Sequence, residues 1–468
     1  MGKRIPVRHV EKRVGRKSVA KGDAIGTSRR FCHNIGHRCY LLTMTSMRSS
    51  IVAGIFLCCI SLETARAQPI KRIDGGQITP QEIDRVVSDL MTKAKVTGLG
   101  LSILNNNRVV YTKTYGYRNK EKQELLDSSS IMYGASFSKA VFAFLVLKLV
   151  DEGFLNLDKP VYRYLDKLLP EYADYVDLGG DDRWKLITPR MCLSHTTGFP
   201  NWRFLGARTA DYDPHGKLAI YFKPGTKYGY SGEGIKLLQL VVEKVTGRNL
   251  EDLASEKIFK PVGMNRTSYI WQQGFEDDYA SPHNADQETL DRKKRKKADA
   301  AGSLQTTIAD YSKFIEYVMQ GRGLSRKMLD AMISPQIAIH SKTQFPSISD
   351  ETTSENNNIH LSYGLGWGLL RSKYGRAFFK EGHDDGWQNY NINFKDKGIS
   401  IVILTNSDNG ESLFKELLEK TIGDTFTPWK WERYTPYDSK ASSRQLKSKM
   451  VGSPESSSHH QNPFERTK

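Results

Sequence analysis

The sequence predicts an α+β fold, in which an antiparallel sheet is built from both ends of the body, is flanked by helices and receives an inserted, mostly helical lobe. Three observations predict it. Strand patterns occupy residues 99–115 near the start of the body and 363–405 near its end. The later strands follow one another too closely for crossover helices, so they are expected to be antiparallel. Between about 155 and 300, the pattern favours helices and loops.

The first 67 residues differ from the rest of the chain in charge and in cysteine content. They hold thirteen Lys and Arg against three Asp and Glu, a charge of +10, which leaves +7 of the net +17 for the body. The body has no basic stripe of the kind that binds nucleic acid, so no nucleic-acid partner is expected. Four of the five cysteines also precede residue 68, so Cys192 cannot form a disulfide within the body.

Residues 47–67 resemble a secretory signal. A short basic start precedes an apolar run at 51–62, and Ala65-Arg66-Ala67 fits an A-x-A cleavage site. The apolar run is too short to span a bilayer, and Cys58 or Cys59 fits a lipid anchor less well because neither has a small-residue lipobox. We therefore expect a secreted or periplasmic protein with no membrane span after cleavage. Residues 1–46 fit a start codon that is assigned too early.

The body begins with a helix and a hairpin. Thr79-Pro80-Gln81-Glu82 is a capping box with proline at the first helical position, and apolar residues at helical spacing follow it. Residues 99–104 and 108–115 alternate as two strands around the polar turn Asn105-Asn106-Asn107. This part supplies the first strands of the expected sheet.

A long apolar helix is expected after the run Tyr133-Gly134-Ala135-Ser136-Phe137-Ser138-Lys139-Ala140, and Gly153 ends it. Ser136 would lie in its first turn, with Lys139 on the same face. A lysine whose pKa is lowered by burial or by a neighbouring cation can take the proton of a serine, which then becomes a nucleophile. An ordinary N-cap is the alternative role for Ser136. The S-x-x-K pattern also occurs at Ser18 and Ser412, but only Ser136 opens a long apolar helix.

The remaining elements complete the expected domain. Helices are predicted at 188–193, 233–246 and 412–421, and strands at 363–370, 377–381, 390–394 and 399–405. The sheet lobe would comprise about 78–154 and 301–437, and the helical lobe about 155–300, within a domain spanning 68–437. Six consecutive basic residues at 292–297 fit a solvated surface loop better than a nucleic-acid or localisation signal. Residues 438–468 are expected to be disordered.

Two later stretches carry ionisable residues in glycine-rich settings. Tyr230 follows the turn Pro224-Gly225-Thr226 and precedes a long helix, and a nearby cation could make it a base. His383 stands in Gly382-His383-Asp384-Asp385-Gly386-Trp387 after a strand. Alone, each residue fits a structural role better than a catalytic one.

Together, these three stretches resemble the serine β-lactamase-related family, which comprises class C β-lactamases, D-alanyl-D-alanine carboxypeptidases and related esterases. The family signature is S-x-x-K, then Y-x-N, then K-x-G or H-x-G. Connecting stretches are also similar to the family: 187–198, Pro224-Gly225-Thr226, Ala301-Gly302-Ser303-Leu304 and Tyr363–Gly368. The resemblance covers roughly residues 80–425 and implies a β-lactamase/transpeptidase-like fold.

The resemblance also implies a role for each motif residue. Ser136 would be the acylated nucleophile, Lys139 its proton partner and Tyr230 a second general base. His383 would stand at the third motif, and the backbone N–H groups of Ser136 and Gly386 would form the oxyanion hole. No cofactor and no metal are implied, and the protein is expected to be a monomer.

Two departures from the family pattern bear on the substrate. Gly232 replaces the asparagine of Y-x-N, and Asp385 stands where the third motif, counted from His383, has glycine. An acid there would repel a substrate carboxylate, which favours an esterase or amidase. The leading hypothesis is a secreted serine hydrolase that acts on a β-lactam, a D-amino-acid peptide or a small ester. The alternatives are a weakly active or inactive penicillin-binding-type protein and, from the basic leader, a DNA- or membrane-surface-binding role.

Overall fold

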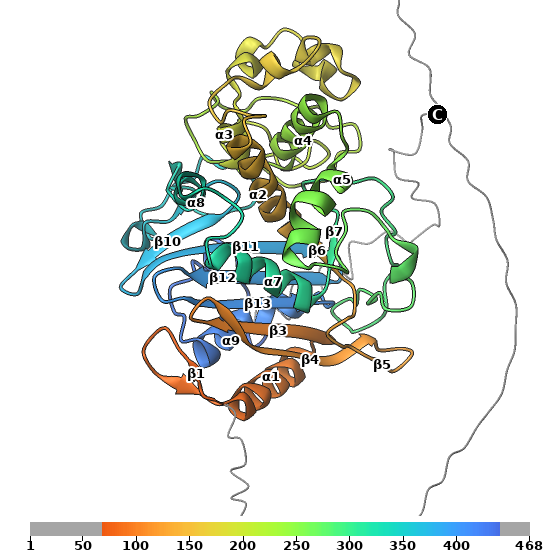
Figure 1. Ribbon diagram of the computed structural model, residues 1–468, viewed down its shortest axis with the longest axis vertical. Coiled ribbons are helices and arrows are strands. Elements are labelled where there is room, and N and C mark those ends of the chain that lie inside the picture. The colour runs from red at the N-terminus through yellow and green to blue at the C-terminus, as the bar shows by residue number, and fades with distance from the viewer. Residues whose placement is uncertain (1–67, 440–468) are drawn as a thin grey trace, which may run out of the picture. The chain divides into compact units, whose positions relative to one another are not determined.

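The computed structural model describes residues 68–439 (Figure 1). The basic leader and the signal-like segment, with Cys58 and Cys59, lie outside the described residues, as does the tail from residue 440 on. Within the described residues, no helix is both long and apolar enough to cross a membrane.

Within residues 68–439, nine strands form the central sheet, and all neighbouring strands are antiparallel. The spatial order is β5 (Glu124–Leu125), β4 (Arg108–Asn119), β3 (Gly98–Asn105), β13 (Ile399–Thr405), β12 (Trp387–Phe394), β11 (Gly375–Asp384), β10 (Gly368–Ser372), β9 (Ser362–Tyr363) and β8 (Ile337–Ala338). The N-terminal and C-terminal strands meet where Ile103 of β3 pairs with Ile401 of β13. The expected α+β fold, with a sheet completed by both ends of the body, is therefore confirmed.

Two further strand pairs lie outside this sheet. They are β1 (Ile70–Lys71) with β2 (Gln77–Ile78), and β6 (Met132–Ala135) with β7 (Leu304–Thr306). The second pair matters most, because β6 leads directly into the helix that follows Ser136.

The α-helices are α1 (Pro80–Ala94), α2 (Phe137–Asp151), α3 (Pro189–Leu193), α4 (Gly232–Thr246), α5 (Leu250–Ala254), α6 (Lys260–Val262), α7 (Ile308–Met319), α8 (Arg326–Met332) and α9 (Phe414–Thr421). Short 3₁₀ helices are η1 (Val161–Tyr164), η2 (Leu169–Glu171), η3 (Ala173–Leu178), η4 (Asp182–Leu186), η6 (Gln273–Phe275), η7 (Asn357–Ile359) and η8 (Gly410–Leu413), and η5 (Ser255–Phe259) is a π-helical turn. The capping box at the start of α1 is present as expected, with Thr79 and Glu82 bonding each other's backbone N–H groups.

The two faces of the sheet have separate cores. Alternation along β13 places Val402 and Leu404 in a core with α2, α4 and α7, and Ile401 and Ile403 in a core with α1 and α9 (Figure 1). Helix α2 is buried on nearly every side, and its apolar residues face both the sheet and the helical segments between about 155 and 300. Ser136 therefore lies where the helical part meets the sheet.

One predicted strand is divided in the structure. Residues 363–370 form the end of β9 and the start of β10 rather than one strand. Gly366 has φ +90°, and a Cβ at this position would collide with Ala143 of α2. The chain bends there because it passes directly against the central helix.

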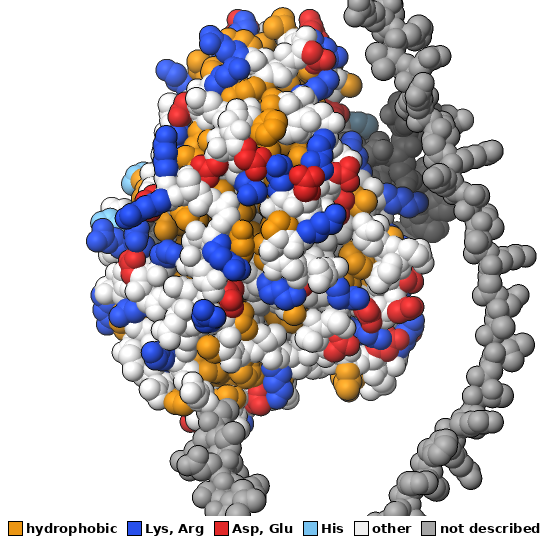
Figure 2. Space-filling view, viewed as in Figure 1, with side chains coloured by type: hydrophobic (Ala, Val, Ile, Leu, Met, Phe, Trp, Pro, Cys, Tyr) orange, Lys and Arg blue, Asp and Glu red, His pale blue; other side chains and the backbone are white. Residues whose placement is uncertain are grey.

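The basic run at 292–297 is more than a solvated loop. Arg292 and Lys294 pair with Glu276, and Lys293 and Arg295 pair with Asp384. Across the visible face of the molecule, acidic and basic side chains are interspersed (Figure 2). The run is thus tied to neighbouring acids, one of which lies on β11.

Candidate active site

Ser136 occupies the N-cap position of α2 but does not act as a cap. Its side chain makes no hydrogen bond to the first-turn backbone, and its own backbone is helical (φ −70°, ψ −2°). The preceding Ala135 is held at φ +47°, in the left-handed region that a residue with a Cβ rarely adopts. The strained turn after β6 therefore presents a half-exposed hydroxyl that no cap interaction occupies.

Lys139 lies one turn along α2 and contacts this hydroxyl. Its Nζ is 3.0 Å from the Oγ of Ser136 and 2.5 Å from the carbonyl oxygen of Ala301. The residue is 1 % exposed. Burial, followed by the positive charge of Lys380, lowers the pKa of Lys139 to about 7. A large share of Lys139 is therefore the neutral amine near neutral pH and can accept the serine proton.

Tyr230 reaches the same point from the loop before α4. Ser231 caps α4 through its Oγ, which accepts from the N–H of Gly234, and the buried His195 accepts from the N–H of Ser231 through Nδ1. The imidazole of His195 also lies against the Tyr230 ring, with the centroids 4.4 Å apart. Tyr230 is 1 % exposed, and the Nζ of Lys139 lies 5.1 Å from the centre of its ring. The expected grouping of Ser136, Lys139 and Tyr230 is thus present in the structure.

A residue that the sequence reasoning missed completes the group. The Nζ of Lys380, on β11, donates to the Tyr230 hydroxyl at 2.9 Å and to Glu381 Oε1 at the same distance. Gln344 also donates to that carboxylate oxygen, at 2.8 Å. Lys380 is 0 % exposed, and burial lowers its pKa even though Glu381 opposes the shift. Burial and the charge of Glu381 raise the pKa of Tyr230 well above its ordinary value, so Tyr230 is a neutral phenol in this site.

Gly382 brings β11 against the start of α2. A Cβ at this position would lie 2.6 Å from the carbonyl oxygen of Gly134 and 3.3 Å from the backbone nitrogen of Ser136. Only glycine permits this approach. Lys380-Glu381-Gly382 therefore fits the K-x-G form of the third motif. This pattern is visible in the sequence, three residues before His383, the residue that the sequence analysis places at that motif.

The side chains of His383 and Asp385 and the backbone N–H of Gly386 do not contact Ser136, Lys139 or Tyr230 as the sequence analysis expects. Alternation along β11 places the His383 side chain on the α1 and α9 face, where its Nε2 lies 3.7 Å from Glu411. Asp385 is exposed in the turn after β11. The N–H of Gly386 donates to Asp408 at 2.6 Å, so it is not free to bind an oxyanion. The strand extends past residue 381 to Asp384, and its alternation directs the His383 side chain away from the site.

Gly232 lies beside the site, but its side-chain space is already filled. A Cβ there would be 2.6 Å from the carbonyl oxygen of Asn201 and 3.0 Å from the ring of Trp202. Asn201 accepts from the Gly232 N–H through both its carbonyl oxygen and its Oδ1, at 3.1 Å each. The indole of Trp202 lies 5.5 Å from the Nζ of Lys139. The loop at 201–202 thus occupies the place that a longer residue at 232 would take.

Two ion pairs flank these residues. Lys236 lies 4.6 Å from the Trp202 ring and 3.8 Å from a carboxylate oxygen of Asp299. Arg295 stacks 3.8 Å above the ring of Tyr133, three residues before the serine, and donates to Asp384 at 2.8 Å. Both cations near the nucleophile therefore already have a carboxylate partner.

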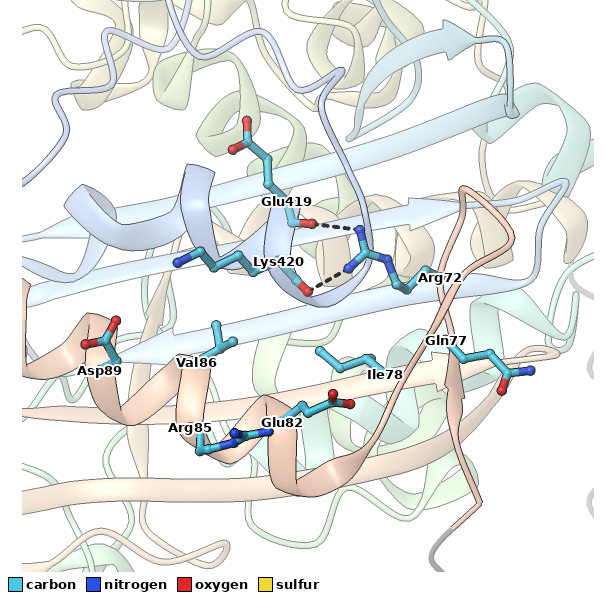
Figure 3. Close-up of a pocket in the computed structure, with 9 residues that line it drawn as sticks. All are labelled: Arg72, Gln77, Ile78, Glu82, Arg85, Val86, Asp89, Glu419 and Lys420. Carbon is cyan, nitrogen blue, oxygen red and sulfur yellow. Dashed lines mark hydrogen bonds between the residues drawn. The ribbon is translucent and has the colours of Figure 1, made fainter.

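Other features of the described residues lie outside this group. No cluster of three or more His, Cys, Asp or Glu between 68 and 439 could hold a metal ion. A surface depression of about 680 Å³ lies beside α1 and α9, where Arg72 donates to the carbonyl oxygens of Glu419 and Lys420 (Figure 3). It lies on the opposite side of the sheet from α2.

The fold resembles those of two proteins of known structure. The octameric penicillin-binding protein homologue from Pyrococcus abyssi aligns with a TM-score of 0.58 and 23% identity, over 73% of this chain and 78% of that one. The D-alanine carboxypeptidase AmpC from Burkholderia cenocepacia aligns with a TM-score of 0.55 and 19% identity, over 70% and 93%. At these identities, the likeness establishes the fold.

Sequence relatives and a family match agree with the fold. Penicillin-binding protein 4* of Bacillus subtilis (strain 168) is 24% identical over 66% of this chain and 68% of its own length. Protein flp of Staphylococcus aureus (strain N315) is 25% identical, but the match spans only 40% of this chain and 38% of that protein. The Beta-lactamase family matches residues 83–421, which include every site residue described above. The chain belongs to the Beta-lactamase family.

Proposed function

We propose that the protein is a serine hydrolase that cleaves an ester or amide through an acyl-enzyme on Ser136. One observation carries the proposal: the uncapped hydroxyl of Ser136 is 3.0 Å from a buried lysine amine whose pKa is lowered to about 7. A serine in this contact can lose its proton as it attacks a carbonyl carbon.

Acylation would use each of the three side chains. The proton of Ser136 moves to the neutral amine of Lys139 as the Oγ–carbon bond forms and the carbonyl electrons move to oxygen. When the tetrahedral intermediate collapses, the bond to the leaving group breaks, and the phenol of Tyr230 gives its proton to that group. Lys139, now an ammonium, restores the proton of Tyr230. Hydrolysis of the acyl-enzyme by water follows the same proton path in reverse.

The backbone would stabilise the developing negative oxygen. The N–H of Ser136 is one donor, at the positive end of α2. Asp384 pairs with Trp387 across the turn that joins β11 to β12, and hydrogen bonding alternates along antiparallel strands. We infer that the N–H of His383 points away from β12, toward the edge beyond Gly368 that β10 leaves open. In this proposal, His383 contributes its backbone rather than its imidazole.

Lys380 would take the role that we assigned to His383 from the sequence. It donates to the Tyr230 hydroxyl at 2.9 Å and would stabilise that oxygen while its proton is in transit. A weakly active or inactive penicillin-binding-type protein remains the second candidate, because no side-chain amide stands at residue 232. The retained contacts among Ser136, Lys139, Tyr230 and Lys380 favour the enzyme.

Covalent labelling tests this proposal. Purified protein is incubated with a fluorophosphonate and with benzylpenicillin, and its intact mass is measured. We expect one fluorophosphonate adduct in the wild type and in Ser412→Ala, which removes the other S-x-x-K serine of the body, and none in Ser136→Ala. Absence of labelling by both probes, or an adduct that persists in Ser136→Ala, would contradict the hydrolase proposal.

We also propose that the protein is exported. The test is to sequence the N-terminus of the protein recovered outside the cytoplasm, and we expect that N-terminus to lie near residue 68.

A further inference from the structure

We propose that this site selects substrates whose acyl group carries no negative charge, and that Glu381 imposes the selection by neutralising Lys380. The inference rests on the proposed function and specifies its substrate class. It would exclude penicillins, whose carboxylate stays on the acyl-enzyme, and it favours uncharged acyl esters and amides.

The Lys380–Glu381 pair is the first reason. The two groups are 2.9 Å apart, their side chains are 0 % and 4 % exposed, and Gln344 donates a further hydrogen bond to the same carboxylate oxygen. The same Lys380 amine donates to the Tyr230 hydroxyl at 2.9 Å. The cation nearest to Tyr230 therefore already has an anion at contact distance, inside the protein where water cannot screen either charge.

The cations on the other sides of the serine are neutralised in the same way. Lys236 has Asp299 within 3.8 Å, and Arg295 has Asp384 at 2.8 Å. Lys139 must be a neutral amine to act as the base. Among the described residues around Ser136, a substrate carboxylate would therefore find no uncompensated positive charge on any of four basic side chains: Lys139, Lys236, Arg295 and Lys380.

Two aromatic side chains lie on one side of the site. The indole of Trp202 lies over Lys139 and Lys236 and stacks on Phe204, with the rings 5.8 Å apart and 9° from parallel. A carboxylate bound against these rings would lose its hydration without gaining a cation, which costs free energy. An alkyl or aromatic group has no such hydration to lose. Charge and surface chemistry thus point to the same class of acyl group.

Two matched esters test the selection. p-Nitrophenyl pentanoate and mono-p-nitrophenyl glutarate share the leaving group and a five-carbon acyl chain, and differ in ending in a methyl group or a carboxylate. For the wild type, we expect kcat/KM to favour pentanoate by about 100-fold. In Glu381→Gln, the preference should fall by at least about tenfold, because Lys380 then faces the substrate without its counter-charge. The ratio is informative even if the variant lowers both rates.

The controls separate a local effect from a general one. Glu355→Gln makes the same change in net charge at an exposed pair with Lys430, and it should leave the preference unchanged. Glu381→Thr provides a second variant, and thermal melting verifies that each protein is folded. Should neither variant fold, the wild-type ratio still decides.

Each outcome supports or overturns the inference. Equal kcat/KM values for the two esters in the wild type overturn it, and so does a preference that is unchanged in folded Glu381→Gln. If the wild type turns over neither ester and no fluorophosphonate labels Ser136, the proposed function itself fails, and the inference fails with it. Turnover of pentanoate with a preference that is unchanged in folded Glu381→Gln overturns the inference and leaves the hydrolase proposal intact.

Discussion

The ammonium of Lys380 donates a 2.9 Å hydrogen bond to the hydroxyl of Tyr230, although the two residues are 150 positions apart in the chain. Strand β11 brings the lysine to this point, and the N-cap loop of α4 brings the tyrosine. The contact places a cation beside the phenol that is proposed to hand a proton to the leaving group.

Replacing this lysine should cost far more activity than replacing the nearby histidine. We expect Lys380→Met to lower kcat/KM by about 100-fold or more, because Tyr230 loses its hydrogen-bond donor. His383→Ala should change kcat/KM by less than about threefold, since its imidazole faces Glu411 on the other side of the sheet. Steady-state kinetics with an uncharged ester measures both.

Because Lys380→Met leaves the Glu381 carboxylate buried without its cation, we expect the variant to be less stable. The double variant Lys380→Met with Glu381→Gln removes that carboxylate charge and keeps the comparison valid. A loss in His383→Ala as large as that in Lys380→Met would show that the third motif is centred on the histidine after all.

The pH dependence of kcat/KM should follow Lys139. Its pKa in the folded protein is lowered to about 7, so below pH 7 it becomes protonated and cannot take the serine proton. Activity should therefore fall as the pH drops through about 7. Lys380→Met should move this limb to higher pH, because the charge of Lys380 lowers the Lys139 pKa. Glu381→Gln should move it to lower pH, because Glu381 raises that pKa. A limb that both variants leave in place would exclude Lys139 as the base.

Substituting Gly382 should disturb catalysis through the backbone. A Cβ would lie 2.6 Å from the Gly134 carbonyl oxygen, so β11 must move away from the start of α2. We expect Gly382→Ala to lower kcat by about 10- to 100-fold, with a smaller effect on KM, because the oxyanion donors separate. Gly274→Ala, where a Cβ meets nothing within 4 Å, is the control. Wild-type kcat in Gly382→Ala would contradict this arrangement of β11 and α2.

Restoring the family residue at 232 should destabilise the protein instead of improving it. In Gly232→Asn, the new Cβ would lie 2.6 Å from the Asn201 carbonyl oxygen, and the loop at 201–202 must shift. We expect the free energy of unfolding to fall by about 2–3 kcal/mol, measured by urea denaturation. A variant as stable as the wild type would mean that the loop can move at little cost.

The sequence predicted the elements whose signals are local. The capping box at Thr79, the helix after Ser136 and the strand at 399–405 all depend on nearby residues, and the structure has them in place. The choice between Lys380 and His383 for the third motif depends on where β11 ends and on which face each side chain takes. Pairing with a neighbouring strand, here β12, sets where β11 ends and which side chains face each side of the sheet. The residue pattern of one strand alone does not determine either feature.

The filling of Gly232's side-chain space by the 201–202 loop also bears on how this protein could change its specificity. The two positions are coupled, because the loop that excludes a side chain at 232 is held by hydrogen bonds to the 232 and 233 amides. An asparagine gained at 232 alone would be selected against before it could contact any substrate. Evolution or engineering toward the recognition used by other family members must therefore remodel the loop first, and the order of the two mutations decides which path is open.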